Sequence, residues 1–332
     1  MNSFTLADCS TVEAALSQLK NGAVVKAGGV DLLDRMKNGT DSPARLVNIR
    51  NIKELRGIQS TPEGLTIGAL TTLAEVAADP AIRAQYTVLA DACGSAATPH
   101  IRNMATVGGN LLQELQCWYF RSAEFQCLRK GKDMCFAFSG LNQYHAIMDY
   151  GGCPSVAPSS AAVAVLALDG SVELVSSKGK RTVAIKDFYV RPDANPQKFN
   201  VMQPDELLTA IRIPKPAPGT KSAYQKYGEK ESHDWAIADA GIVLEMDGDT
   251  CKRAVVAMGA ASPVVRRSPE AEAALIGKPI TQETARAAGK AAMTNAMPLS
   301  MNAYKVQLFP VAVYRTVLLA AGQMERDPSA AG

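Results

Sequence analysis

Three features of the sequence predict an α+β fold. Apolar patterns typical of helices and of strands are both present, but they do not alternate strictly along the chain. A strand–loop–helix–strand unit lies near the start, and a proline-rich segment at 214–219 separates a second group of strands and helices from the first. With 332 residues, the chain is long enough for two or three domains that each bury a core.

The first elements form a small βαβ-like unit. Ala15, Leu16 and Leu19 share one face at helical spacing, Thr11 is a possible cap, and Gly22 ends the pattern. The predicted elements are a helix at 12–20, a strand at 23–25, a helix at 31–39 and a strand at 45–49.

Strands and helices mix in the middle of the chain. The segment 80–94 carries Ile82, Tyr86, Leu89 and Ala92 at helical spacing and predicts one long helix. The other predicted elements are a strand at 65–67, a helix at 72–78, an apolar segment at 161–168, a hairpin of 171–177 with 180–186, and a strand at 207–214. Beyond the proline-rich segment, we expect strands at 236–246 and 253–258 and helices at 269–276, 281–296 and 303–323.

Composition excludes several classes of function. The net charge is only +3 and the basic residues are scattered, so nucleic acid is not an expected partner. No apolar run has the length of a membrane span. The first residues show no secretory signal, which predicts a cytoplasmic protein by its own sequence, or a periplasmic one if a partner subunit carries the export signal.

Two glycine-rich loops are the most informative motifs. The first glycine loop is 26–33, KAGGVDLL, and the second glycine loop is 98–110, TPHIRNMATVGGN. Without a Cβ, glycine lets backbone amides approach a diphosphate closely, and successive amides can bind an anion. For either loop alone, an ordinary tight turn is as good an interpretation as a phosphate-binding loop. Neither loop has the GxGxxG or P-loop pattern, and the polar side chains of the second favour a cofactor with a long phosphate-containing body.

The two loops closely resemble the FAD-binding loops of the medium subunit of the molybdenum hydroxylases, the xanthine dehydrogenase and aldehyde oxidoreductase family. The resemblance continues at 298–315, PLSMNAYKVQLFPVAVYR, and so spans nearly the whole chain. It implies a two-subdomain FAD-binding fold followed by a C-terminal α/β domain with a three-stranded sheet and helices. The implied boundaries are 1–57, 58–216 and 219–325.

The resemblance also implies how FAD is held. The first glycine loop and residues 106–110 would hold the diphosphate and ribityl chain, Ile101, Arg102 and Asn103 would lie nearer the flavin, and Lys226 matches a lysine near the FAD. A solvated strand lysine is the other interpretation of Lys226. The implied cofactor-binding residues are Lys26, Ala27, Gly28, Gly29, Val30, Asp31, Leu32, Leu33, Thr98, Ile101, Arg102, Asn103, Thr106, Gly108, Gly109, Asn110 and Lys226.

The chain departs from the family pattern at two places. Pro158-Ser159-Ser160 stands where family members usually have an aspartate in the third position. Glu229 and Glu231 follow Lys226 where an arginine is usual.

Four of the seven cysteines lie in one segment, 117–153, which has no regular periodicity and which we call the cysteine insertion. Cys117, Cys127, Cys135 and Cys153 are separated by nine, seven and seventeen residues. Structural zinc sites normally contain a tight Cys-x2–4-Cys pair, which is absent from this spacing. The wide spacing suits a 4Fe–4S cluster around which the segment wraps, and four unrelated thiols are the alternative.

The cysteine insertion resembles the one in the periplasmic aldehyde oxidoreductase type of FAD subunit, which carries an additional 4Fe–4S cluster. On this basis Trp118, Tyr119 and Phe120 would shield the cluster from water. Nearby basic residues would offset its negative charge or merely solvate the segment, and His145 is a candidate for hydrogen bonding or for the electron path. These basic residues are Arg121, Arg129, Lys130 and Lys132.

Together these features predict an electron-transfer subunit of a molybdenum-containing hydroxylase, with an aldehyde as the expected substrate. By resemblance, the partners form a heterotrimer with this chain: a molybdenum-cofactor large subunit and a 2Fe–2S small subunit. Electrons would pass through FAD to an external acceptor. Two alternatives stay open: a self-contained FAD oxidase, for which His145 is the modest candidate for a base, and a zinc-stapled scaffold.

Overall fold

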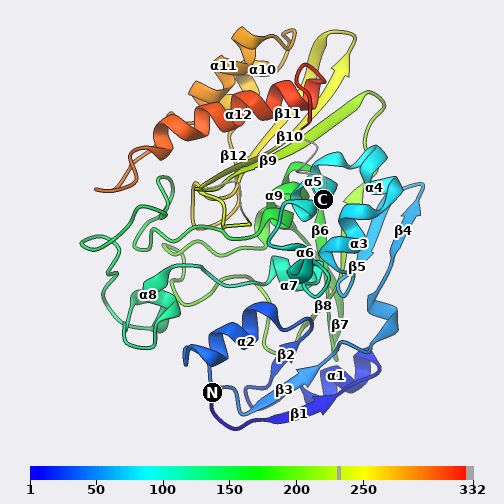
Figure 1. Cartoon of the computed structure of the whole chain (residues 1–332). Helices are drawn as coiled ribbons and strands as arrows, with labels where there is room; N and C mark the ends of the chain where they lie inside the picture. Colours follow the sequence, from blue (N-terminus) through cyan, green and yellow to red (C-terminus); the bar gives the residue numbers. More distant parts are fainter. Residues whose placement is uncertain (230–232, 327–332) are drawn as a thin grey trace.

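A computed structural model describes residues 1–229 and 233–326 of the chain. Its first unit is a small parallel sheet with two helices, at the bottom of Figure 1. The strands are ordered β1-β3-β2, with β1 at Thr5–Asp8, β3 at Arg45–Asn48 and β2 at Val24–Lys26. The helices are α1 at Val12–Gln18 and α2 at Val30–Lys37. The predicted βαβ unit is confirmed, and the first glycine loop joins β2 to α2.

The second unit contains a five-stranded antiparallel sheet of order β4-β5-β8-β6-β7. Its strands are β4 at Ile58–Thr61, β5 at Gly64–Gly68, β8 at Leu207–Pro214, β6 at Ser171–Ser176 and β7 at Gly179–Ala184. Its helices are α3 at Leu73–Ala78, α4 at Pro80–Gln85, α5 at Thr87–Gly94, α6 at Pro99–Arg102, α7 at Val107–Leu111 and α9 at Ser160–Ala167. Every residue of α9 is buried, so this apolar helix forms the centre of the molecule.

The single helix predicted at 80–94 is wrong. Tyr86 leaves helical geometry, with φ −129° and ψ 46°, and divides the segment into α4 and α5. Its ring is buried in the core, and the chain turns there. The spacing of apolar residues continues across the break, which is why periodicity alone does not reveal it.

The third unit is a four-stranded sheet of order β12-β11-β10-β9, covered by three helices (Figure 1). Three strands are long and the fourth has two residues: β9 at Thr220–Tyr227, β10 at Ala238–Asp247, β11 at Thr250–Met258 and β12 at Arg266–Arg267. The helices are α10 at Pro269–Leu275, α11 at Gln282–Ala291 and α12 at Lys305–Ala321. The expected three-stranded sheet is thus present as β9, β10 and β11, although the prediction from periodicity had omitted β9.

Alternate residues of β10 pack into two different cores. Val243 belongs to the central core that contains α9, whereas Ile242 and Leu244 belong to the core beneath α10–α12. Because successive side chains of a strand point to opposite faces, both faces of this sheet are covered. The third unit therefore packs firmly onto the second.

The cysteine insertion has little regular structure, as predicted. It contains the short helix α8 at Trp118–Arg121 and a 3₁₀ turn at Leu128–Lys130. Its end is held by the start of α12: the Asn302 amide donates to the carbonyls of His145 and Ala146 at 3.0 and 3.1 Å. None of the helices in the described ranges has both the length and the apolarity needed for a membrane span.

Lys305 is fully buried, and its Nζ donates to the carbonyls of Tyr144, His145 and Ala260 at 3.2, 3.0 and 2.9 Å. Burial lowers the pKa of Lys305 from 10.5 to about 7. Lys305→Met leaves three carbonyls without this donor, so we expect the free energy of unfolding to fall by about 1–3 kcal/mol near neutral pH.

The same substitution tests the lowered pKa of Lys305. Between pH 7 and 10.5 the unfolded chain binds this proton and the folded chain does not, so the contribution of Lys305 to stability rises with pH. Thermal unfolding of both proteins across this range should show the difference in Tm growing with pH. A difference that is constant, or that shrinks as pH rises, contradicts the lowered pKa.

Candidate functional site

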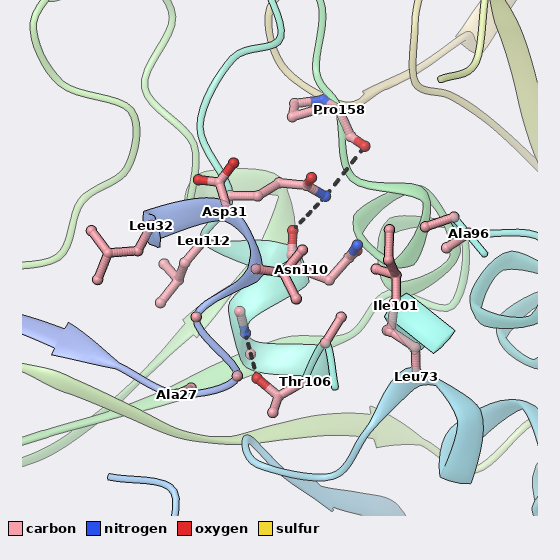
Figure 2. A pocket seen from close by; sticks show the side chains of 18 of the residues that line it. Ala27, Asp31, Leu32, Leu73, Ala96, Ile101, Thr106, Asn110, Leu112 and Pro158 are labelled. Carbon is pink, nitrogen blue, oxygen red and sulfur yellow. Dashed lines mark hydrogen bonds between the residues drawn. The ribbon is translucent and has the colours of Figure 1, made fainter. Parts of the chain in front are cut away.

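The two glycine loops meet at a cavity of about 290 Å³ that is lined by all three units. Figure 2 shows its walls: Ala27, Asp31 and Leu32 come from the first glycine loop and α2, while Thr106 and Asn110 come from the second glycine loop. The two loops are far apart in the sequence and face each other across this space.

Gly28 is the point at which the two loops touch. A Cβ at Gly28 would lie 2.0 Å from the carbonyl oxygen of Met104 in the second glycine loop, a distance that no side chain tolerates. Gly29 then takes the left-handed conformation, with φ +81°, as the residue before α2. Both glycines are required by the backbone, one for close approach and one for its φ angle.

The start of α2 is open to an anion. Gly29 precedes the helix and has no side chain to cap it, so no side-chain oxygen accepts from the first amides of α2. These amides and the helix dipole favour negative charge at this end of an eight-residue helix. The first glycine loop thus offers a backbone site for phosphate.

The second glycine loop is held in shape by its own side chains. The Gly109 amide donates to Thr106 Oγ1 at 3.1 Å, and Asn110 Oδ1 accepts from the Ser159 hydroxyl at 2.7 Å. The Gln113 amide donates to the carbonyls of Asn110 and Pro158 at 3.1 and 3.3 Å, as dashed lines in Figure 2 show. The wall is therefore a preformed turn.

The third unit closes the cavity with Lys226 and the segment 233–236. Lys226 Nζ donates to the carbonyls of Ser95 and Asp234 at 2.6 and 3.0 Å, and burial lowers the pKa of this lysine. Trp235 is 53% exposed, a large indole left at the mouth of the cavity. It offers a planar aromatic ring a surface for stacking.

Twelve of the seventeen residues predicted to bind the cofactor line this cavity: Ala27, Gly28, Gly29, Val30, Asp31, Leu32, Ile101, Thr106, Gly108, Gly109, Asn110 and Lys226. The other five flank it: Lys26, Leu33, Thr98, Arg102 and Asn103. Thr98 caps α6 by accepting from the Ile101 amide, and Arg102 donates to the carbonyls of Ala96 and Ala97.

Several lining residues carried no signal in the sequence. They include Ala96, Ala97, Gln113, Glu206 and Trp235, which the fold brings to the cavity from four separate segments. Ala97 has a left-handed φ of +47°, a strained conformation that alanine rarely adopts and that its residue type therefore does not predict.

The two departures from the family pattern lie near the site. Ser159 caps α9 and Ser160 lines the cavity where the family usually places an aspartate. Glu229 accepts a hydrogen bond from the Tyr144 hydroxyl of the cysteine insertion. Glu231 lies outside the described residues.

The four cysteines of the insertion lie near enough to one another to affect each other's pKa: Cys153 acts on Cys135, and Cys127 and Cys153 act on Cys117. Arg129 Nε donates to Cys153 Sγ at 3.4 Å. The neighbouring Cys135 lowers the pKa of Cys153, while burial raises the pKa of Cys117 to about 11.

Within residues 1–229 and 233–326, no group of three or more His, Cys, Asp or Glu side chains is arranged to hold a single metal ion. Aromatic side chains nevertheless lie beside two of the cysteines, since Cys117 and Cys127 share an apolar cluster with Phe120, Phe136 and Phe199. Of the basic residues predicted to offset a cluster's charge, Arg129 lies against a thiol. Arg121 turns toward Asp31, and Lys130 donates to the Phe125 carbonyl.

A second cavity of about 250 Å³ lies between the cysteine insertion and the segment 234–236. Cys117, Trp118 and His145 line one side, and the segment 234–236, which also lines the first cavity, lines another. His145 Nε2 lies 3.3 Å from Cys117 Sγ, and burial lowers the pKa of His145 to about 4. His145 therefore stays neutral and belongs to the cysteine site, away from the first cavity.

An uncapped helix start, two glycine turns and the exposed indole of Trp235 around one cavity are the features expected of a protein that binds a dinucleotide cofactor. Residues 2–216 match the family described as "FAD binding domain in molybdopterin dehydrogenase", and residues 222–320 match "CO dehydrogenase flavoprotein C-terminal domain". The chain belongs to this family of FAD-binding subunits of molybdenum hydroxylases.

Named relatives agree with this assignment. The chain is 33% identical to the aldehyde oxidoreductase FAD-binding subunit PaoB of Escherichia coli, over 93% of this chain and 95% of that one. It is 28% identical to the carbon monoxide dehydrogenase medium chain of Hydrogenophaga pseudoflava, over 94% and 89%. The solved carbon monoxide dehydrogenase of the same organism superposes with a TM-score of 0.76, 26% identity and coverage of 98% and 99%.

Gly28→Ala tests the meeting of the two loops. Its Cβ would collide with the Met104 carbonyl, so the loops must separate, and we expect the purified protein to lose most of its FAD, as absorbance after denaturation would show. Gly109→Ala is the matched comparison, because its Cβ would meet only the Thr106 hydroxyl at 3.0 Å, and we expect a smaller loss. Full FAD content in Gly28→Ala would contradict the required contact.

Proposed function

We propose that this chain is the FAD-binding electron-transfer subunit of a molybdenum-containing aldehyde oxidoreductase. It would pass electrons from 2Fe–2S centres on a small subunit to an external acceptor, while a large subunit with the molybdenum cofactor oxidises the aldehyde. The feature that carries the proposal is the pair of glycine loops around one cavity, together with membership of the family. The aldehyde as substrate rests on the similarity to the PaoB subunit.

The first cavity suits FAD. The open start of α2 would hold the diphosphate, Thr106, Asn110 and the glycines would line the ribityl chain, and Trp235 would cover the flavin ring. Bound there, FAD supplies the ability to accept electrons singly and to release them as a pair. The chain's own residues orient the cofactor and shield its body from water. We take 1–57, 58–216 and 219–325 as the domains that enclose it.

The cysteine insertion suits a 4Fe–4S cluster held by Cys117, Cys127, Cys135 and Cys153. In such a cluster each thiolate binds a different iron, so the four sulfurs stand farther apart than the ligands of one ion. The donor set is all sulfur, Arg129 supplies a positive charge at one sulfur, and aromatic rings pack beside Cys117 and Cys127. Since an all-sulfur set suits zinc as well, the wide spacing of the four cysteines is the feature that favours a cluster beside the flavin cavity.

The position of the second cavity supports electron transfer within the chain. The segment 234–236 separates the FAD cavity from the cavity at Cys117, so a cluster and a flavin would lie on two sides of one loop. A self-contained oxidase is less well supported, because its candidate base, His145, faces Cys117. A zinc-stapled scaffold is less well supported, because the described residues lack a group suited to one ion.

Iron and acid-labile sulfide analysis tests the cluster. We expect about four irons per chain in the purified protein, and the loss of nearly all iron when Cys117, Cys127, Cys135 or Cys153 is replaced by serine. Cys251→Ser is the control, since this buried thiol lies in the third unit and donates to the Arg253 carbonyl, a role that serine can take over. One zinc per chain, or iron retained in all four variants, would contradict the cluster.

Flavin reduction separates the electron-transfer role from an oxidase. The isolated chain should keep its yellow absorption when aldehydes are added without oxygen, and should lose it rapidly once the large and small subunits are present. A spectrophotometer under anaerobic conditions suffices for this measurement. Rapid bleaching of the isolated chain by a substrate would favour the oxidase.

A further inference from the structure

An ion-pair network joins the FAD cavity to the cysteine insertion. Arg121 Nη2 lies 2.6 Å from Asp31 Oδ1, and Arg35 Nε lies 3.2 Å from Asp31 Oδ2. Arg35 Nη1 also pairs with Glu114 at 2.8 Å, and the Glu114 amide donates to Asp31 Oδ2 at 3.2 Å. We call these four residues the Asp31 clamp.

Asp31 stands in the first turn of α2, next to the amides proposed to bind the diphosphate. Its carboxylate accepts from the backbone N–H of Glu114 and from the Arg121 guanidinium, so the segment before Cys117 contacts a residue that also lines the cavity. Figure 2 shows Asp31 in the cavity wall. α2 packs on Leu46 through Leu32 and Met36, and the pairs of Asp31 with Arg121 and of Arg35 with Glu114 tie it to residues 114–121 as well.

Arg121 is the last residue of α8, which begins directly after Cys117. Its amide donates to the Cys117 carbonyl at 2.9 Å, and its guanidinium donates to the carbonyls of Leu115 and Glu114 at 2.7 and 2.9 Å. The planar guanidinium is thus fixed between the cysteine site on one side and Asp31 on the other. A shift of Cys117 would move α8, and Arg121 at the end of α8 would pass the shift to Asp31.

Two physical arguments make this link effective. The side chains of Arg121 and Asp31 are only 10% and 19% exposed, so solvent screens their attraction weakly. A helix of four residues has no stability of its own. α8 is therefore held by its surroundings, which are the contacts of Arg121 at one end and of Cys117 at the other, so a group that binds Cys117 acts directly on the start of α8.

We propose that a loaded four-cysteine site tightens FAD binding through Arg121 and Asp31, so that Arg121 is a positioning residue for the flavin. This inference rests on the proposed cluster. Coupling between two sites is reciprocal, so bound FAD equally favours the loaded cysteine site. The cysteine insertion would then serve the assembly of the flavin site as well as electron transfer.

The test is a cycle of four full-length proteins: wild type, Cys135→Ser, Arg121→Gln and the double variant. FAD affinity is measured from the recovery of flavin fluorescence on dilution, without any assay of activity. We expect Cys135→Ser to raise the Kd for FAD about tenfold, within the range of typical coupling free energies. Arg121→Gln should have a similar effect, and the double variant should be no weaker than either single variant.

Two further variants separate positioning from general damage. Arg253→Gln is the matched control, because Arg253 also pairs with two carboxylates, Glu245 and Asp169, but lies on β11 away from both cavities. It should leave FAD affinity unchanged. Arg121→Lys keeps the charge and should restore part of the affinity and part of the response to Cys135→Ser.

Each outcome decides the matter. If the effects of Arg121→Gln and Cys135→Ser multiply in the double variant, the two act independently and the inference is overturned while the proposed cluster stands. If wild-type protein contains no iron, the proposed cluster fails and the inference fails with it. Non-additive effects in a protein that contains iron support the Asp31 clamp as the link.

Discussion

The contact between Gly28 and the Met104 carbonyl is the constraint on which the site depends. A backbone atom of one loop occupies the space that any side chain at residue 28 would need. This contact sets the distance between β2 and the second glycine loop, and so the width of the cavity. The contact between Gly28 and Met104 positions the two loops, and the glycines at 29, 108 and 109 give the cavity wall its shape. Binding of a long cofactor follows from this meeting of two backbones.

The cysteine insertion shows how a long irregular segment can be fixed without strands or helices of its own. Backbone groups that have no ladder must find other partners. Here Asn302 and Lys305, at the α12 end of the chain, donate to carbonyls of the insertion. In return, Arg129 of the insertion donates to the carbonyls of Pro196 and Lys198. The segment is therefore held from several sides.

Sequence patterns located most elements because the spacing of apolar residues shows which face of a helix or strand is buried. They failed where another influence decided the structure. Strand β9 carries Lys221, Gln225 and Lys226 beside the proline-rich segment and lacks a strand pattern, yet pairing with β10 makes it a strand. The glycine motifs predicted one wall of the cavity, whereas Ala96, Glu206 and Trp235 reach it only through tertiary packing.

Three basic side chains around the cavity are bonded to backbone carbonyls, so the backbone amides of α2 are left to bind an anion. Lys26 lies near the Ala27 carbonyl, Arg102 donates to Ala96 and Ala97, and Lys226 donates to Ser95 and Asp234. All three contact backbone carbonyls around the cavity and so stabilise its turns. The open amides of α2 remain as the group best placed to meet a diphosphate. These amides belong to α2, which packs on Leu46 through Leu32 and Met36 and is tied to the cysteine insertion by the pair of Asp31 with Arg121. The more firmly these contacts hold α2, the more firmly its first amides are fixed in front of the cavity.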